Sequence, residues 1–480
     1  MIPCMETTMR TFQHPAEELP ICAEVDVLVV GGGPAGVAAA FASARLGAST
    51  LVVEQFNCLG GVGTAGGHGH ISLYSSFGNP GWGTDELVVG GIPYEMAVRV
   101  AEAGYGAFDR RNCDFEVEGM KLVLERMAGE CGVRLLYHTF YVRTLVEDGV
   151  AIGAVVQNKG GRQVVLAKRI VDCSGDGDAA ASAGCPFEQG NAEGQCQPVT
   201  LMFQLGGVDM ERVQAYIREQ KDNRLVATWK RAQEAGDMRA FQSVIMGWWW
   251  TVTRPDQLGI NFTHITGVDA TKAEQLTAAT TEGRRQAEET VRVYRKYVPG
   301  MEKCHMLSTP PTIGVRETRR ILGDYVLTKE DLVAEREFTD SIGYGSFYID
   351  IHNTKGAGMD ARMFYPHNGF KYQIPWRVQL PRAIENLTTA GRCVSLTHEA
   401  LGSVRVMPQC GILGQAAGTA SALSLARGCT PRALPVAELQ ASLRSQGCIV
   451  DAADVVRVNA ALPPRSSVPV TAPVRMPRCA

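Results

Sequence analysis

Several features are missing from this sequence, and each absence narrows what the protein can do. Its 14 cysteines form no Cys-x-x-Cys pair, which argues against an iron–sulfur cluster or a dithiol redox motif. No stretch of about 18 consecutive apolar residues occurs, so we predict no transmembrane helix. The formal net charge is only -3, and no long charge run suggests nucleic acid or a membrane as partner. A small-molecule substrate is the default expectation.

The N-terminal segment and the scattered cysteines bear on location. Residues 1–23 carry charged side chains and lack an apolar h-region, so we interpret them as a mobile lead-in rather than a secretory signal. Scattered cysteines in a long chain fit reduced thiols in the cytoplasm. The sequence leaves the oligomeric state open, and a homo-oligomer is compatible with it.

The order of the expected elements predicts an α/β fold with a discontinuous first domain. Strand 24–30, a glycine turn, helix 34–47 and strand 49–54 form a β-α-β unit. A helical period over 115–131 precedes alternating segments up to residue 173, which predict a β-meander. We therefore expect a Rossmann-like domain (24–75, 109–186 and 386–430), an inserted α+β substrate domain (76–108 and 187–385) and a C-terminal helical extension with an extended tail (431–480).

The middle of the chain has a different order of expected helices and strands, and residues after 386 resemble the first domain again. Within 187–385 we expect helices at 209–220, 270–297 and 328–335, and strands at 199–205, 248–253, 259–265 and 342–351. After residue 386 we expect a strand at 387–390 and a small-residue helix at 408–428. One or two short helices should follow within 431–461, and an extended or disordered tail should begin at Pro463.

The first glycine turn, Gly31-Gly-Gly-Pro-Ala-Gly36, matches a dinucleotide-binding fingerprint. A strand precedes it, a helix follows it, and Glu54 ends the next strand. Gly31 permits the tight turn, Gly33 lets the backbone approach a pyrophosphate, and Gly36 lets the helix pack on the strand. Glu54 would accept hydrogen bonds from an adenosine ribose. The fingerprint alone does not separate NAD from FAD.

Two further glycine segments match the same pattern less well. Gly61–Gly66 is followed by Gly-His-Gly-His instead of a helix. Gly175-Asp-Gly-Asp178 follows a strand, but its aspartates would repel a phosphate and suit flavin hydroxyls better. The chain therefore lacks a convincing second dinucleotide site, which flavoenzymes that bind NAD(P)H on a separate domain usually have.

Six motifs taken in order carry a family resemblance. They are Gly31–Gly36, Glu54, Cys58-Leu-Gly-Gly61, Asp172-Cys-Ser-Gly-Asp-Gly-Asp178, Ala390-Gly-Arg-Cys393 and Gly411-Ile-Leu-Gly-Gln-Ala-Ala-Gly418. The set resembles FAD-dependent oxidoreductases of the glutathione-reductase-like superfamily. Within it, the chain is similar to the bacterial FAD-dependent oxidoreductases related to fumarate reductase and succinate dehydrogenase flavoproteins. The segments 314–320, 348–352 and 397–408 add to that likeness, which spans roughly residues 24–428.

The resemblance implies FAD as cofactor and assigns candidate contacts. Gly31, Gly33 and Gly36, with Pro34 and Ala35 between them, would face the pyrophosphate, and Glu54 the ribose. Gly391 and Arg392 take the place where many relatives have Gly-Asp, and the arginine of this chain can pair with phosphate directly. The start of the 408–428 helix would point at the flavin and stabilise its anionic reduced form. The other candidate contacts are Gly60, Gly61, Thr64, Gly175, Asp176, Gly411 and Leu413.

The catalytic candidates are His398, Arg405 and Arg316. A histidine near the flavin could take a substrate proton, and an equally open alternative is that His398 only fixes its loop. Arg316 belongs to a charged cluster with Glu317, Arg319 and Arg320 that could clamp a carboxylate, or could equally be a solvated strand or an interface pair. By analogy with fumarate reductase relatives, Arg316 or Arg405 could donate a proton.

Other reactive side chains have weaker interpretations. His68, His70 or Cys58 could attach the flavin covalently, although a packed thiol is favoured for Cys58. His352 and Asp350 end an expected strand, but no third ligand suggests a metal, so we predict none. Aromatic residues of the inserted domain are interpreted as core rather than pocket wall; they are Phe241, Phe262 and the run Trp248-Trp-Trp250.

These residues together predict an FAD enzyme that moves two electrons between a small organic substrate and flavin, with dehydrogenation preferred to reduction. A substrate with a carboxylate or several hydroxyls would suit the arginine-rich motifs. A flavin monooxygenase remains an alternative. A non-catalytic flavoprotein that serves as an electron-transfer subunit is another, although the lack of cysteine clusters disfavours an electron wire.

Overall fold

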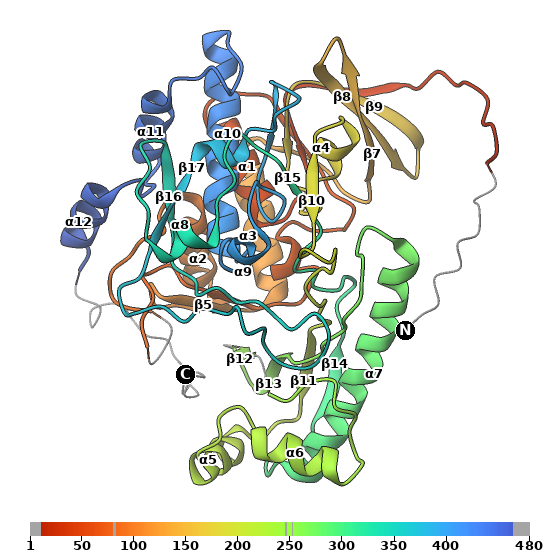
Figure 1. Cartoon of the computed structure of the whole chain (residues 1–480), viewed down its shortest axis with the longest axis vertical. Coiled ribbons are helices and arrows are strands. Elements are labelled where there is room, and N and C mark those ends of the chain that lie inside the picture. Colours follow the sequence, from red (N-terminus) through yellow and green to blue (C-terminus); the bar gives the residue numbers. More distant parts are fainter. Residues whose placement is uncertain (1–10, 80–82, 245–246, 252, 464–480) are drawn as a thin grey trace.

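A seven-stranded sheet runs through the larger part of the molecule (Figure 1). The computed structural model describes residues 11–79, 83–244, 247–251 and 253–463. The predicted tail after Pro463 lies outside the described residues. The strand order is β6-β2-β1-β9-β8-β7, with β18 paired to the end of β9. Their bounds are β1 Ile21–Val30, β2 Thr50–Val53, β6 Arg134–Leu136, β7 Phe140–Glu147, β8 Val150–Asn158, β9 Gly161–Asp172 and β18 Leu387–Thr389.

The sheet has a parallel part and an antiparallel part. Strands β6, β2, β1, β9 and β18 pair in parallel, whereas β7 and β8 form the antiparallel meander. The last four residues of β1 are buried, as expected for a strand covered on both faces. The parallel sheet and the β1-α1-β2 unit confirm the predicted α/β fold with a Rossmann-like unit and meander.

Two helices from opposite ends of the chain pack on each other beside this sheet. Helix α1 (Pro34–Arg45) and helix α10 (Met407–Arg427) are rich in small residues and largely buried. A Cβ at Gly414 would lie 1.9 Å from the carbonyl oxygen of Ala35, and one at Gly418 would lie 2.1 Å from that of Ala39. The two backbones therefore touch only because both positions are glycine. This contact brings the N-terminal ends of α1 and α10 to the same side of the sheet.

A second unit has its own sheet and core, below the first in Figure 1. Its sheet order is β12-β13-β11-β14, and the long helix α7 lies beside it. Trp229, Phe262 and Tyr294 are fully buried in its core, with the first two rings stacked at 4.3 Å. The bounds are β11 Phe203–Gly206, β12 Gly247–Thr251, β13 Arg254–Asn261, β14 His305–Ser308, α5 Met210–Gln220, α6 Val226–Glu234 and α7 Ala273–Tyr297.

The remaining elements cover the first sheet and connect the two units. Strands β3, β4 and β5 form a small sheet, β10 pairs with β15, and β16 pairs with β17. The strands are β3 His70–Ser72, β4 Gly106–Phe108, β5 Asn112–Phe115, β10 Phe187–Gln189, β15 Arg319–Ile321, β16 Ser341–Gly345 and β17 Tyr372–Pro375. The helices are α2 Gly91–Glu102, α3 Val117–Cys131, α4 Asp178–Ser182, α8 Lys329–Val333, α9 His398–Val404, α11 Val436–Ser445 and α12 Ala452–Ala461.

The predicted strand 342–351 is wrong in its second half. Strand β16 ends at Gly345, and Asp350 lies outside the named strands, while His352 forms only an isolated bridge to Met359. Residues 348–352 are all buried, and Ile349 forms only an isolated bridge to Phe364, so the apolar pattern reflects burial on all sides rather than a continued strand. The predicted strand 259–265 is shifted, because β13 begins at Arg254 and ends at Asn261.

Residues 327–380 contribute buried side chains to the same hydrophobic cluster as α1 and α10, among them Leu327, Ile342 and Trp376. The predicted domain boundaries stay a prediction. Each cysteine in the described part of the chain is a free thiol. Across those same residues, the helices are all too short or too polar to cross a membrane.

Candidate active site

The loop between β1 and α1 has the shape that its glycines predict. Gly31 has a φ of +93°, and a Cβ there would lie 2.6 Å from the carbonyl oxygen of Cys173. A Cβ at Gly36 would lie 1.8 Å from the carbonyl oxygen of Gly31, so the helix can approach the strand only at a glycine. Gly33 differs, because the nearest atom to its Cβ would be 4.0 Å away. The protein itself therefore leaves room in front of Gly33.

Glu54 lies beside this loop and is 6% exposed. Its carboxylate accepts hydrogen bonds from the backbone N–H of Gly32 at 2.6 Å and of Phe56 at 2.8 Å. Burial raises the pKa of Glu54 above its ordinary value, and the backbone hydrogen bonds oppose that shift. The carboxylate is held at the end of β2, the position predicted to meet a ribose.

A second glycine loop packs directly on the first. The N–H of Gly60 donates to the carbonyl of Gly32 at 2.8 Å, and Gly60 has a φ of +102°. A Cβ at Gly61 would lie 2.8 Å from Cα of Gly33. The hydroxyl of Thr64 is used within the loop, where it donates to the carbonyl of Leu59 at 2.5 Å. Glycine at 60 and 61 therefore lets two backbones meet.

A cavity opens between these loops and the start of α10. Pro34, the first residue of α1, lies on one wall, and Met407, Pro408 and Gly411 from the first turns of α10 lie on another. The other lining residues are Gly60, Gly63, Ile71, Tyr74, Pro93, Met96, Phe115, Met120 and Leu124. Two helix N-termini thus converge on one mostly apolar cavity.

The second flavin motif and the Ala390–Cys393 motif meet in space. Arg392 donates to the carboxylate of Asp176 at 2.9 Å, and a Cβ at Gly175 would lie 2.5 Å from the Arg392 guanidinium. Gly391 has a φ of +91°, with Ala35 3.3 Å from its Cβ position. Nη1 of Arg392 is buried and has no partner among the described residues. Asp176 occupies one nitrogen of Arg392. Whether Arg392 also pairs with a phosphate stays a prediction. The backbone carbonyl of Leu413 accepts from Gln379 at 2.8 Å.

Arg316 and Arg405 lie near each other and are largely buried. Glu317 and Arg320 are buried as well, so the interpretation of the cluster around Arg316 as a solvated strand is wrong. Arg316 donates to the carbonyl of Pro198 at 2.7 Å and to the hydroxyl of Thr200 at 2.6 Å. Arg405 donates to the carboxylate of Asp350 at 2.9 Å. Burial and the nearby Arg405 lower the pKa of Arg316 to about 9, so it still carries a proton at pH 7.

Three histidines lie within the electrostatic influence of Arg316 and are uncharged at neutral pH; His264 and His352 are buried and His68 is partly buried. Burial lowers the pKa of His68 and of His352 to about 3, and that of His264 to about 4; the charge of Arg316 adds to each shift. Burial opposes ionisation of Asp350, but His352, Arg405 and Arg316 keep its pKa below its ordinary value. Arg316 and Arg405 therefore carry two positive charges, and Asp350 carries one negative charge.

Buried polar atoms with no partner within the described residues gather around this cluster. They include Nε of Arg405, Oδ1 of Asp350, Nδ1 of His352, Nδ1 of His68 and Nε2 of Gln197. The other amide atom of Gln197, Oε1, lies 3.5 Å from Nη2 of Arg405. Burying a polar group without a hydrogen bond is costly, so a concentration of such atoms marks a place built to meet a ligand.

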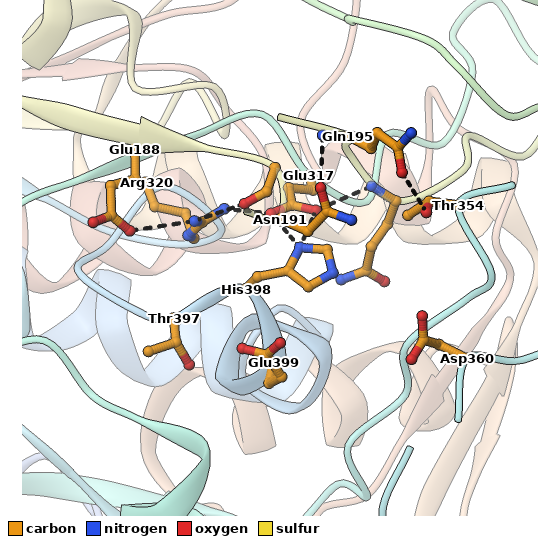
Figure 2. A network of polar contacts seen from close by, with 12 residues as sticks. Glu188, Asn191, Gln195, Glu317, Arg320, Thr354, Asp360, Thr397, His398 and Glu399 are labelled. Atoms are coloured by element: carbon orange, nitrogen blue, oxygen red, sulfur yellow. Dashed lines mark hydrogen bonds and ion pairs between the residues drawn. The ribbon is translucent and has the colours of Figure 1, made fainter. Parts of the chain in front are cut away.

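His398 stands at the centre of a second polar network, shown in Figure 2. It is the first residue of α9, whose N-cap is Thr397, and its Nδ1 lies 2.9 Å from the carboxylate of Glu317. Glu317 also binds Arg320. Figure 2 shows the His398 ring pointing toward Glu317, with Arg320 on the other side of that carboxylate. The sequence predicted His398 and the charged cluster separately, and the structure brings them together.

Of the three candidates for covalent flavin attachment, His70 and Cys58 are held by contacts within the protein. Nδ1 of His70 binds Asp114 at 2.5 Å, and the thiol of Cys58 is buried, with burial raising its pKa. His68 packs edge-on against Trp249, with ring centroids 4.7 Å apart. Trp249 thus borders the histidine cluster, whereas Phe262 lies in the core of the second unit as predicted. The side chain of Trp250 lies outside the described residues.

Several site residues escaped prediction. Gln197 and His264 carry no motif, and nothing in the sequence links them to Arg405; Gln409 lies in the predicted helix 408–428 but was not singled out. Gln409 is fully buried in the first turn of α10, and both of its side-chain amide atoms lack a partner in the described structure. No group of histidine, cysteine and carboxylate side chains among the described residues is arranged to hold a metal ion.

The sequence profile of the FAD dependent oxidoreductase family matches residues 26–443. This match covers most of the chain, from β1 to α11, and the chain belongs to this family. Its cofactor is FAD. No curated protein sequence gives a match to the chain.

Solved structures similar to this chain are distant from it. A geranylgeranyl bacteriochlorophyll reductase-like protein from Thermoplasma acidophilum is 12% identical, with a TM-score of 0.45 over 92% of this chain and 96% of that one. A p-nitrophenol 4-monooxygenase from Pseudomonas putida is 10% identical, with a TM-score of 0.42 over 91% and 93%. An anhydrotetracycline hydroxylase from Streptomyces rimosus is 13% identical, with a TM-score of 0.39 over 88% and 65%.

The residues present fit FAD. The open space in front of Gly33 is one that a Cβ would fill, and the free N–H groups of the α1 N-terminus suit a pyrophosphate. The carboxylate of Glu54 stands where a ribose is expected. Nη1 of Arg392 and the amide of Gln409 are buried polar groups that would gain partners. Glu54, Gly33, Arg392 and the first turn of α10 are therefore the groups that would hold the cofactor.

Proposed function

We propose that the protein is an FAD-dependent dehydrogenase that oxidises a small organic anion, one that carries a carboxylate. The observation that supports this most is the buried pair of Arg316 and Arg405. Two guanidinium groups face one carboxylate, Asp350, while the histidines around them are neutral. A buried cation is stable only when it is paired, so this site favours one further negative charge.

The arginines would bind and orient the substrate. A guanidinium offers several N–H donors in a fixed plane that matches a carboxylate. Nε of Arg405 and Nε2 of Gln197 are donors still without partners among the residues described. His68, His264 and His352 stay uncharged and therefore add polar surface without attracting a second anion. Trp249 closes one side beside His68 and limits access of water.

FAD, when bound, supplies the chemistry of accepting two electrons as a hydride. The protein positions the substrate carbon, excludes water and takes up the remaining proton. The dipole and free N–H groups at the start of α10 favour negative charge near the cavity that Met407, Pro408 and Gly411 line. That arrangement stabilises a reduced cofactor that carries an extra negative charge.

The test is an anaerobic screen that follows bleaching of the oxidised flavin. The panel pairs each acid with an uncharged compound of the same carbon skeleton: lactate with propanediol, and succinate with butanediol. We expect at least one acid to bleach the flavin and its uncharged partner to fail, because only the acid reaches both arginines. An absorption spectrum before and after acid precipitation shows first that the flavin is present and whether it is covalently bound.

Two outcomes would contradict the proposal. Equal bleaching by an acid and its diol would remove the role of the arginine pair. Bleaching by NADPH alone, followed by rapid consumption of oxygen, would instead favour a monooxygenase.

A further inference from the structure

We infer that Nε2 of His398 accepts the substrate proton and that Glu317 is the positioning residue that fixes His398 in the required tautomer. This inference rests on the function proposed above and adds the group that moves the proton. It is carried by the network of Figure 2, in which three buried side chains are joined in a row.

The direction of the His398–Glu317 hydrogen bond follows from chemistry. The side chain of Glu317 is fully buried and that of His398 is 4% exposed, and their atoms lie 2.9 Å apart. An ionised carboxylate can only accept hydrogen bonds, so Nδ1 of His398 must carry the hydrogen. In the neutral form of the imidazole, the lone pair is then on Nε2. Glu317 therefore leaves Nε2 as the basic nitrogen.

Glu317 cannot turn away from this contact because both of its oxygens are held. One oxygen accepts from the backbone N–H of Gln197 at 3.0 Å, and the other binds Arg320. Arg320 is itself fixed by the carbonyls of Leu396 and Gly190, both at 3.0 Å. A carboxylate with this many contacts is a rigid support, not a surface ion pair.

The basic nitrogen is left for a ligand. Nε2 of His398 is buried, and the described part of the chain gives it no hydrogen-bond partner. Gln197 joins the two networks, since its backbone N–H binds Glu317 and its side chain lies 3.5 Å from Arg405. An acid held by Arg316 and Arg405 would thus have its hydroxyl or amine group on the side of His398. The substrate class that fits is a carboxylic acid with a neighbouring hydroxyl or amine.

The step balances with oxidised FAD as the electron acceptor. The O–H or N–H bond of the substrate breaks and its proton goes to Nε2 of His398. The adjacent C–H bond breaks and its hydrogen leaves with two electrons to FAD. A C=O or C=N bond forms in the substrate, which is oxidised by two electrons, while FAD is reduced by two.

The first test is the tautomer, which needs no substrate. The protein is labelled with nitrogen-15 histidine, and the resonances of His398, one of nine histidines, are assigned by their loss in His398→Gln. We expect Nδ1 to be protonated and Nε2 to be unprotonated in the FAD-bound protein. In Glu317→Gln no carboxylate accepts from Nδ1, so the preference for the Nδ1-protonated tautomer should weaken and the Nε2-protonated form should appear.

The second test is the rate of flavin reduction by the acid found most active in the panel. Glu317→Gln and His398→Gln should each slow reduction roughly 10²- to 10⁴-fold, while the acid concentration for half-maximal rate changes little. Glu188→Gln is the matched control, because Glu188 approaches the same Arg320 at 3.5 Å but is 58% exposed and does not touch His398. It should retain the wild-type rate and tautomer.

Protein folding is checked by melting temperature and flavin content. If Glu317→Gln does not fold because Arg320 is left buried without its partner, the double variant Glu317→Gln/Arg320→Met removes both charges and takes its place. Wild-type rates in the Glu317 variant, or a His398 proton on Nε2 in the native protein, would overturn the inference alone. A wild-type flavin that no acid reduces would overturn the proposed function, and with it the proton transfer.

Discussion

The two ends of the candidate active site are built in different ways. At the cofactor end, loops 31–36 and 58–64 and the helices α1 and α10 meet backbone to backbone, and glycine is required at each close contact. At the substrate end, side chains from residues 197, 316–320, 350–352 and 398–405 meet through hydrogen bonds and charge. The first end depends on the absence of side chains and the second on their presence.

This difference teaches where a substitution should act. A Cβ added at the cofactor end changes shape and affects folding or FAD affinity according to what it meets. A polar group removed at the substrate end leaves the backbone in place and changes charge or proton transfer. Four substitutions separate these effects.

Gly36→Ala should abolish folding or FAD binding. Its Cβ would lie 1.8 Å from the carbonyl oxygen of Gly31, so β1 and α1 would have to move apart, at a cost of about 3 kcal/mol or more. Flavin absorbance per protein and the melting temperature measure this. Gly129→Ala in α3 is the control, because a Cβ there meets nothing within 4 Å, and it should be neutral or slightly stabilising. A yellow, stable Gly36→Ala protein would contradict the close packing.

Arg316→Met should lower kcat/KM for the acid substrate about 30- to 1000-fold, equivalent to roughly 2–4 kcal/mol, because a buried guanidinium would no longer meet the carboxylate. FAD content should stay at the wild-type level. Steady-state or stopped-flow kinetics measure the change. Arg212→Met provides the comparison, since Arg212 forms an exposed ion pair with Glu302 and should have no effect on rate. Equal kinetics in the two variants would count against the arginine pair.

Gly33→Ala should weaken FAD binding without changing the stability of the fold. Its Cβ would find no protein atom closer than 4.0 Å, so the apoprotein should melt at the wild-type temperature. The Cβ would instead occupy the space in front of the α1 N-terminus and weaken FAD binding about tenfold or more. Fluorescence titration of apoprotein with FAD gives the Kd. Unchanged affinity would show that the pyrophosphate lies elsewhere.

Asp178→Asn should have the smallest effect, seen only in the pH dependence of stability. Desolvation, together with Asp176 and Asp172, raises the pKa of Asp178 to about 6 from 3.8, although the side chain is 44% exposed and its ion pair with Arg319 opposes the shift. Its stabilising contribution is therefore fully present below about pH 4 and is lost as pH rises through about 6. The variant should gain up to about 2 °C on the wild type between pH 4 and pH 7. Parallel melting curves across that range would exclude the effect.

Much of the cofactor end could be predicted because its determinants lie close together in sequence. The Gly31–Gly36 turn, the strand before it and Glu54 fall within one β-α-β unit, and glycine spacing reports the backbone shape directly. Helix α10 was predicted within one residue at each end because its small-residue pattern is continuous. The family profile confirms the FAD prediction that these motifs gave.

The substrate end could not be assembled from the sequence. His398 and Glu317 were singled out, but their contact joins residues 81 positions apart, and no local pattern encodes it. Asp350 was assigned to a strand, whereas it pairs with Arg405 in a loop region. Gln197 and His264 stand in no motif, and their importance comes only from the atoms that they bring to a buried cluster.

The contact between α1 and α10 also determines when the FAD-binding fold can form during translation. Helix α1 ends at Arg45, whereas its partner α10 is complete only when Arg427 has been synthesised. The buried, small-residue surface of α1 must wait for most of the chain before it is covered. The FAD site is therefore complete only near the end of translation. A prematurely terminated chain would lack α10 and would expose the apolar surface of α1 to chaperones.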